Sequence, residues 1–144
     1  MEELVELRTY LEQGRYADAL SLVGEMDEMS RDDKINKIMS YIEILLIHII
    51  KKHAEKRSVR SWEISIRNSI RTIERSNKRR KAGGYYLTKD ELQEAIDETY
   101  QAALDLASLE AFEGQYDELY LARKIDEKQL KKEALNLILD AQVL

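Results

Sequence analysis

The chain contains no proline among its 144 residues. At the usual proline frequency of about 5%, a chain of this length would carry roughly seven. Proline lacks a backbone N–H and fixes φ, so it interrupts the interior of helices. A chain without proline can form long helices, and no stretch of this sequence shows the sustained alternation of apolar and polar residues that is typical of a strand. The sequence therefore predicts an all-α fold.

Apolar residues recur at helical spacing in six segments, separated by glycines and polar residues. Capping residues mark two of the starts: Ser30 with Asp33, and Thr88 with Glu91. The predicted helices cover residues 2–13, 15–29, 30–53, 61–78 and 88–113, and the last begins near residue 126. Because the connections are short, we expect a single antiparallel bundle of about five to six helices. One helical domain would then span residues 1–144, with residues 114–144 as a C-terminal extension.

The segment 30–53 is the most apolar of the six. Ile44 and Ile47 lie outside its main apolar arc, so this helix is apolar nearly all round and is predicted to be central and most buried. In the preceding segment, the residues predicted to point inward are Tyr16, Leu20, Val23 and Met26.

Charge is distributed unevenly along the chain. The formal net charge is −5, but residues 51–81 carry twelve lysines and arginines against three glutamates. In the segment 61–78, Trp62, Ile66, Ile70 and Ile73 form a narrow apolar stripe, and cations at helical spacing lie opposite. The candidate partner-binding residues are Arg60, Arg67, Arg71, Arg75 and Lys78, continued by Arg79, Arg80 and Lys81.

Three interpretations of this basic stripe remain open. Nucleic acid is one partner, because phosphate contacts need such a row of cations and Tyr85 and Tyr86 could stack on bases. A protein surface is another, since residues 88–113 carry a net charge of −7 and residues 1–30 a net charge of −6. The stripe could also be a solvated face. We favour contact with a protein partner or a second copy of the chain.

Catalytic patterns are weak. Without cysteine and with only two histidines, a zinc site is poorly supported, and no cofactor is expected. His48 is predicted to be structural, bonded to a neighbouring helix, and His53 to be solvated. Carboxylates paired at i, i+3 could hold magnesium in a nucleotide hydrolase, and they occur as Glu25 with Glu28 and Glu94 with Asp97. The sequence therefore favours a non-enzymatic interaction module, with nucleic-acid binding through residues 57–81 as the alternative and a metal-dependent nucleotide hydrolase as the second.

Location follows from what the sequence contains. The longest apolar run, from Ile44 to Ile50, is far shorter than the ~20 residues that span a bilayer, and the N-terminus is acidic. We expect a cytoplasmic protein without membrane contact.

Three sequence pieces carry a family resemblance over residues of about 14–112. The first is Gly14-Arg15-Tyr16, followed by an acidic helix end at residues 25–29. The second is the run Leu45-Leu46-Ile47-His48-Ile49-Ile50-Lys51, which is similar to "LLxHLLK". The third is residues 57–66, which are similar to "RSxSWxxTI" and include Ser61 and Trp62; Tyr100 and Ala103 are similar to a later "YxxA".

In order and spacing these pieces resemble the domain-of-unknown-function family twenty-nine, an all-helical bacterial family. The resemblance implies the fold and no reaction, and it implies structural roles for His48, Ser61 and Trp62. The chain departs from the family pattern at Lys52, where a tryptophan is usual, and in lacking a proline after the helix 61–78. We expect Trp62 to anchor the core, with Ser61 as the helix cap.

Overall fold

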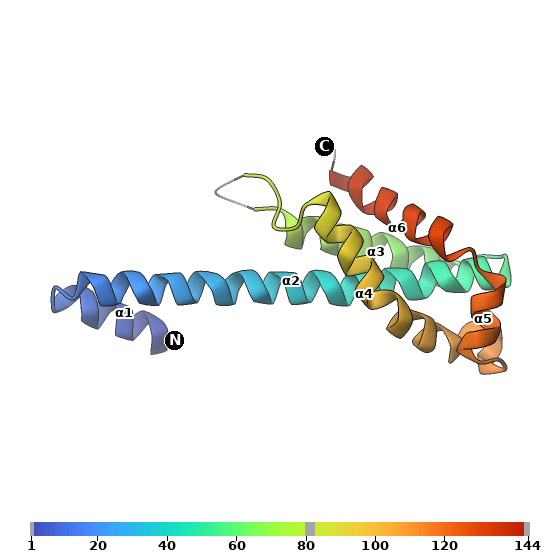
Figure 1. Ribbon diagram of the computed structural model, residues 1–144, viewed down its shortest axis with the longest axis horizontal. Helices are drawn as coiled ribbons and strands as arrows, with labels where there is room; N and C mark the ends of the chain where they lie inside the picture. The colour runs from blue at the N-terminus through green and yellow to red at the C-terminus, as the bar shows by residue number, and fades with distance from the viewer. Residues whose placement is uncertain (1, 80–82, 143–144) are drawn as a thin grey trace. The chain divides into compact units, whose positions relative to one another are not determined.

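The computed structural model describes residues 2–79 and 83–142, and Figure 1 shows that the regular structure in them is helical. One isolated bridge joins Lys78 to Tyr85. The elements are α1 (Glu2–Glu12), α2 (Tyr16–Glu55), α3 (Arg60–Asn77), α4 (Lys89–Ser108), the 3-10 helix η1 (Ala111–Gly114), α5 (Glu118–Lys124) and α6 (Glu127–Gln142). The prediction of an all-α fold is confirmed.

The chain divides into two compact units, residues 1–34 and 35–144. In the first unit, α1 and the start of α2 form a helical hairpin. Gly14 makes the turn with a φ of +70°, a conformation that costs glycine little because it has no Cβ. The N–H of Arg15 donates to the Tyr10 carbonyl at 2.8 Å, which closes the end of α1.

The predicted break before Ser30 is wrong, because the 40-residue helix α2 runs through this position without interruption. Ser30 is exposed there, so packing does not require a turn. An exposed serine costs a helix only a few tenths of a kcal/mol relative to alanine. Ending one helix and nucleating another is more expensive, because nucleation orders several residues for one hydrogen bond.

The predicted inward face of the hairpin is also wrong. The exposed fractions of Tyr16, Leu20 and Val23 are 65%, 73% and 45%, while Ala19 and Leu22 are the buried residues of this segment. Within the first unit, α2 has only α1 beside it, so it buries one narrow arc, leaves Met26 half-buried and exposes Tyr16, Leu20 and Val23.

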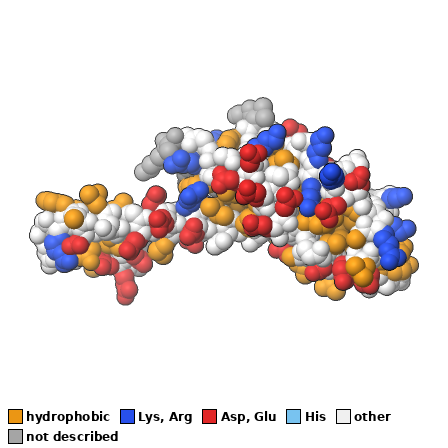
Figure 2. Space-filling model, viewed as in Figure 1, with side chains coloured by type: hydrophobic (Ala, Val, Ile, Leu, Met, Phe, Trp, Pro, Cys, Tyr) orange, Lys and Arg blue, Asp and Glu red, His pale blue; other side chains and the backbone are white. Residues whose placement is uncertain are grey.

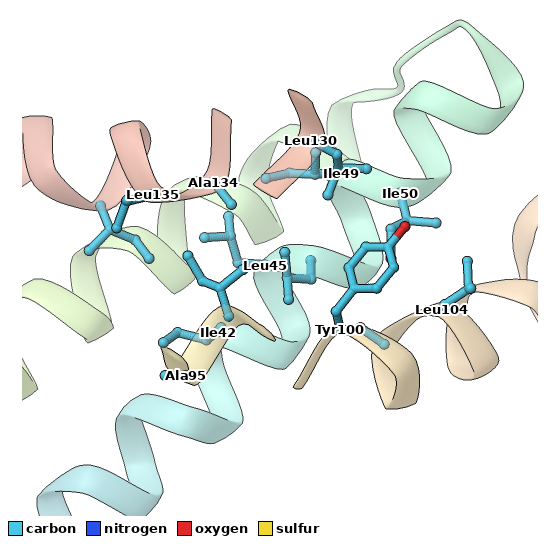
Figure 3. Close-up of a cluster of buried hydrophobic side chains, with 14 of the residues drawn as sticks. Ile42, Leu45, Ile49, Ile50, Ala95, Tyr100, Leu104, Leu130, Ala134 and Leu135 are labelled. Atoms are coloured by element: carbon cyan, nitrogen blue, oxygen red, sulfur yellow. The ribbon is translucent and has the colours of Figure 1, made fainter. Parts of the chain in front are cut away.

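The core of the second unit forms around the second half of α2. Figure 3 shows Ile42, Leu45 and Ile49 of this helix among side chains from α4 and α6. The fully buried large side chains are Ile38, Ile42, Leu45, Leu46, Ile49, Ile50, Ile73, Leu92, Ile96, Leu121, Leu130 and Ile138. Each stabilises the fold by about 1.5–3 kcal/mol relative to an exposed side chain. The prediction of a central buried helix is thus confirmed for the part that begins at Ile38.

The C-terminal residues belong to this core. Helix α6 packs against both α3 and α4, and its Leu130, Ala134 and Ile138 are buried. Asp126 caps α6 near the predicted start, since its Oδ1 accepts from the Gln129 N–H at 3.2 Å. Residues 114–142 are therefore an integral part of the second unit.

The connection between α4 and α6 differs from the expectation. The capping box of Thr88 and Glu91 is confirmed at the start of α4, but this helix ends at Ser108. The chain then forms η1, in which Phe112 and Glu113 have positive φ values of 53° and 57°. The Glu55 carboxylate of α2 accepts the Phe112 N–H at 3.1 Å and holds this turn, after which the short α5 follows.

Candidate partner-binding groove

An open groove of about 930 Å³ runs along the exposed side of α3. Tyr41 and Ile44 of α2 and Ala141 of α6 line it. Residues of α3 and the position after it supply the rest of the lining: Ser65, Asn68, Ser69, Ile70, Arg71, Thr72, Glu74, Arg75 and Lys78. The groove therefore combines apolar, hydroxyl and cationic side chains.

The amphipathic sequence of α3 explains this placement. Ile66 and Ile73 are buried against the core, as the predicted apolar stripe requires. Residues four positions apart lie near one another on a helix surface, so Arg67, Arg71 and Arg75 share the exposed side. The sequence prediction that the basic residues lie opposite the buried stripe is confirmed.

The groove takes in only part of the basic stripe. Arg71, Arg75 and Lys78 line it, whereas Arg60 and Arg67 are exposed on the same helix outside its lining. The guanidinium of Arg79 lies 5.9 Å from the ring centre of Tyr86. Of the remaining predicted cations, Arg80 and Lys81 lie outside the described residues.

Pairing of the stripe with the acidic helix of its own unit is not observed. Within residues 35–79 and 83–142, the ion pairs to described carboxylates use other cations. Asp97 of α4, for example, lies 3.1 Å from Lys131 of α6, and Glu110 lies 3.1 Å from Lys51 of α2. Asp97 and Glu110 thus pair with lysines of other helices, and the groove cations make no ion pair with the described carboxylates of this unit.

Lys131 of α6 lies between the Asp97 carboxylate and the Tyr100 ring of α4. Its Nζ lies 4.8 Å from the ring centre of Tyr100 and 3.2 Å from Glu127. Burial acts to lower the pKa of Lys131, but hydrogen bonds to Asp97 and Glu127 outweigh it and raise this pKa. Burial, with a contribution from the Glu127 charge, raises the pKa of Tyr100 to about 12. Both groups therefore keep their protons at neutral pH, which preserves the local charge balance.

The residues of the family motif have different contacts from those expected. Trp62 is half-buried, with Lys51 Nζ 5.0 Å and the Arg57 guanidinium 5.1 Å from its ring centre. Ser61 is exposed and does not cap α3, because the helix begins one residue earlier with Val59 at the cap position. The indole is therefore held by cation–π contacts rather than by the core.

The two histidines also differ from the prediction. His48 Nδ1 lies 2.9 Å from the carbonyl oxygen of Ile44 in its own helix, not in a neighbouring one. His53 is not simply solvated, since its Nε2 lies 2.6 Å from Glu133 of α6. Among the residues that the structure describes, no three His, Asp or Glu side chains gather as a metal site would require.

Sequence reasoning missed the apolar lining of the groove. Ile44 is 36% exposed, whereas Ile42, Leu45 and Leu46 beside it are fully buried. The signal was present, because Ile44 lies outside the main apolar arc of its helix. An isoleucine outside such an arc indicates either a buried all-apolar helix or a second apolar contact surface, and the periodicity of one helix cannot distinguish the two.

Tyr85, which could have stacked on bases, has an internal contact instead. Its hydroxyl donates to the backbone carbonyl of Gln142 at 2.7 Å. Tyr86 is half-buried beneath Arg79. Figure 2 shows that acidic and basic side chains are interspersed on the face of the molecule in view.

The second unit is thus an all-helical bundle with an open amphipathic groove along α3. The family model described as "Domain of unknown function DUF29" matches residues 5–135, and the chain belongs to this family. The match confirms the resemblance and extends it beyond residue 113, in agreement with the role of α6 in the core. No curated protein and no solved structure matches the chain. None of the helices in residues 2–79 and 83–142 has the length and apolarity needed to cross a bilayer.

Proposed function

We propose that the protein is a non-enzymatic interaction module whose groove binds an acidic, amphipathic segment of a protein partner. The observation that carries the proposal is the exposure of Ile44 beside Arg71, Arg75 and Lys78 in one groove. The preferred occupant is a helical segment with apolar residues on one face and carboxylates flanking them.

The apolar part of the groove favours a protein ligand. Tyr41 and Ile70 are partly buried next to Ile44 and together offer a patch that gains stability when water is removed from it. Sugar and phosphate groups would gain little from this patch. An apolar side chain of a partner would gain about 25 cal/mol for each Å² of apolar surface buried.

The cationic part sets the charge of the partner. Arg71, Arg75 and Lys78 repeat at helical spacing along one side, so they can pair with carboxylates that repeat at the same spacing on a partner helix. Glu74 also lines the groove and disfavours a carboxylate beside it, which adds selectivity for position.

Nucleic acid is the second candidate, supported by the row of exposed guanidinium groups at Arg60, Arg67, Arg71 and Arg75. A phosphate backbone would use the whole row, inside and outside the groove, with a steep dependence on salt. The formal net charge of −5 and the internal contact of Tyr85 favour the protein ligand.

The two candidates differ in which arginines matter. The test compares two double variants. The groove pair carries Arg71→Glu and Arg75→Glu, and the control pair carries Arg60→Glu and Arg67→Glu, which lie outside the groove lining. The probes are a fluorescent 20-residue helical peptide with a leucine stripe flanked by glutamates, its lysine counterpart, and a labelled 30-nucleotide DNA.

We expect the glutamate peptide to bind, the groove pair to weaken binding by tenfold or more, and the control pair to change it by less than threefold. The lysine peptide and the DNA should bind negligibly near physiological salt. Tight, salt-sensitive DNA binding that both pairs reduce equally would instead establish the second candidate. All variants should stay folded, because these arginines make no ion pairs to described residues of their unit.

A further inference from the structure

The hairpin of α1 and the start of α2 carries a second surface that the groove does not involve. Leu20 is the most exposed of its large apolar residues, and Figure 2 shows hydrophobic side chains on the surface of this hairpin. Besides Val5 and Met29, which lie on other sides of their helices, the exposed large apolar residues of this unit are Leu4 and Leu11 on α1 and Tyr16, Leu20 and Val23 on α2.

These residues form one face. At about 100° per residue, Tyr16, Leu20 and Val23 fall within an arc of about 60° on α2, next to the arc of Ala19 and Leu22 that α1 covers. On α1, Leu4 and Leu11 lie at a similar angle from the side that faces α2. In an antiparallel hairpin they therefore fall on the same side as Tyr16, Leu20 and Val23. The charged residues on the opposite side of α2 are Asp18, Glu25, Glu28 and Asp32.

The spacing along α2 is self-complementary. Tyr16, Leu20, Val23 and Asp27 follow at intervals of four, three and four residues, which is the spacing of a coiled-coil seam. This series reads the same from both ends, with apolar residues in the middle and a phenol and a carboxylate at the ends. Two copies that run antiparallel would therefore match each residue of the seam with a suitable partner.

We propose that two copies of the chain associate through this face, with their α2 helices antiparallel about a two-fold axis between Leu20 and Val23. Leu20 of one copy then packs against Val23 of the other, and the Tyr16 hydroxyl donates to the Asp27 carboxylate. The two hairpins together make a four-helix bundle. This self-association goes beyond the proposed function, because it uses another surface and another partner.

The size of the hairpin supports a second copy as the occupant. Helix α1 has no buried residue, and the first unit comprises 34 residues. Units below about 40 residues usually need oligomerisation or a cross-link to be stable, and this unit has no cysteine. The seam from Tyr16 to Asp27 is about 17 Å long, which is short, so we expect a reversible dimer that dissociates at micromolar concentrations.

Sedimentation velocity of the full chain over a range from about 1 to 200 µM tests the proposal. The variant Leu20→Lys places a charge on the seam, and Ser21→Lys places the same charge on the neighbouring exposed residue on another side of the helix. We expect the wild type and Ser21→Lys to dimerise, and Leu20→Lys to raise the dissociation constant at least tenfold. A wild type that stays monomeric, or a Leu20→Lys dimer as stable as the wild type, would overturn the proposal.

The absence of native cysteine allows a second test of the antiparallel arrangement. The double variant Leu20→Cys, Val23→Cys should form a disulfide-linked dimer on mild oxidation, while Ser21→Cys should form little. Equal cross-linking of the double variant and of Ser21→Cys would refute the proposed antiparallel seam. The pair Arg71→Glu, Arg75→Glu should still dimerise, so failure of the groove and failure of the dimer are distinguishable.

Discussion

Asn77, at the end of α3, offers a quantitative test of what joins the helices of the second unit. Its side chain is fully buried and makes three hydrogen bonds. Oδ1 accepts the Leu87 N–H at 2.7 Å, and Nδ2 donates to the Leu87 carbonyl at 3.3 Å and to Gln142 Oε1 at 2.9 Å. The Asn77 amide therefore connects the end of α3 to Leu87, just before α4, and to the end of α6.

The substitution Asn77→Ala removes all three bonds and leaves the buried polar groups of Leu87 without these partners. A hydrogen bond contributes about 1 kcal/mol net, and a buried group left unsatisfied costs about 1–3 kcal/mol. Because the 3.3 Å bond is long, we expect a loss of about 3 kcal/mol in the free energy of unfolding. That is a large share of the 5–15 kcal/mol that is typical of a domain.

Urea denaturation followed by fluorescence measures this loss, because Trp62 is the one tryptophan of the chain and lies in the second unit. The midpoint should fall while the slope m stays unchanged. The matched control is Asn68→Ala, which truncates an exposed asparagine of the same helix and should change stability by less than about 0.5 kcal/mol.

A loss below about 1 kcal/mol for Asn77→Ala, or a loss equal to that of the control, would refute this reasoning. Asn77→Asp separates the hydrogen bonds from the volume of the side chain. It keeps the acceptor for the Leu87 N–H but turns the donor into an oxygen that faces the Leu87 carbonyl. At pH 7 it should be at least as destabilising as alanine, because it adds repulsion between buried oxygens.

Two further predictions concern charge and apolar packing. Hydrogen bonds from Lys52 and Ser58 lower the pKa of Glu63 from its usual 4.5, so the ionised form stabilises the fold at pH values above 4.5 and this contribution is lost as the pH falls through the lowered pKa. The wild type should therefore be more stable than Glu63→Gln by less than ~1 kcal/mol at pH 7, and the difference in urea midpoints should shrink as the pH falls below 4.5; a difference that grows on acidification would contradict this. Ile42→Ala should lower the free energy of unfolding by about 2–5 kcal/mol, because Ile42 is fully buried. Ile44→Ala should lower it far less in thermal unfolding and yet weaken binding of the glutamate peptide. Equal losses of stability would argue against an exposed groove lining.

The helical segments could be predicted from the sequence because their signals are local. The capping box at Thr88 and the apolar stripe of α3 with Ile66 and Ile73 act through neighbours within one or two turns. The exposed side of α3 could be predicted for the same reason, because the periodicity of a helix determines which of its residues lie opposite its buried face. Where a local signal was optional, as at Ser30, the prediction failed, because a cap residue is also tolerated inside a helix.

Which apolar residues are buried depended on packing between helices. Tyr16 and Leu20 belong to a regular apolar face but are exposed. Ala19 and Leu22 are buried instead, because α1 covers that side of α2. Trp62 has the composition of a core residue, yet two cations hold it near the surface. Periodicity identifies an apolar face but does not say which neighbour will cover it.

The sequence by itself determined the positions of most helices and the side of α3 that carries the arginines, since both follow from residues within a few turns of each other. Only the tertiary structure decided that Ile44 of α2, Arg75 of α3 and Ala141 of α6 line one groove. These residues are far apart in the chain, and their meeting depends on how three helices pack around a shared core. Packing also decided that Asp97 of α4 pairs with Lys131 of α6 and not with the basic residues of α3.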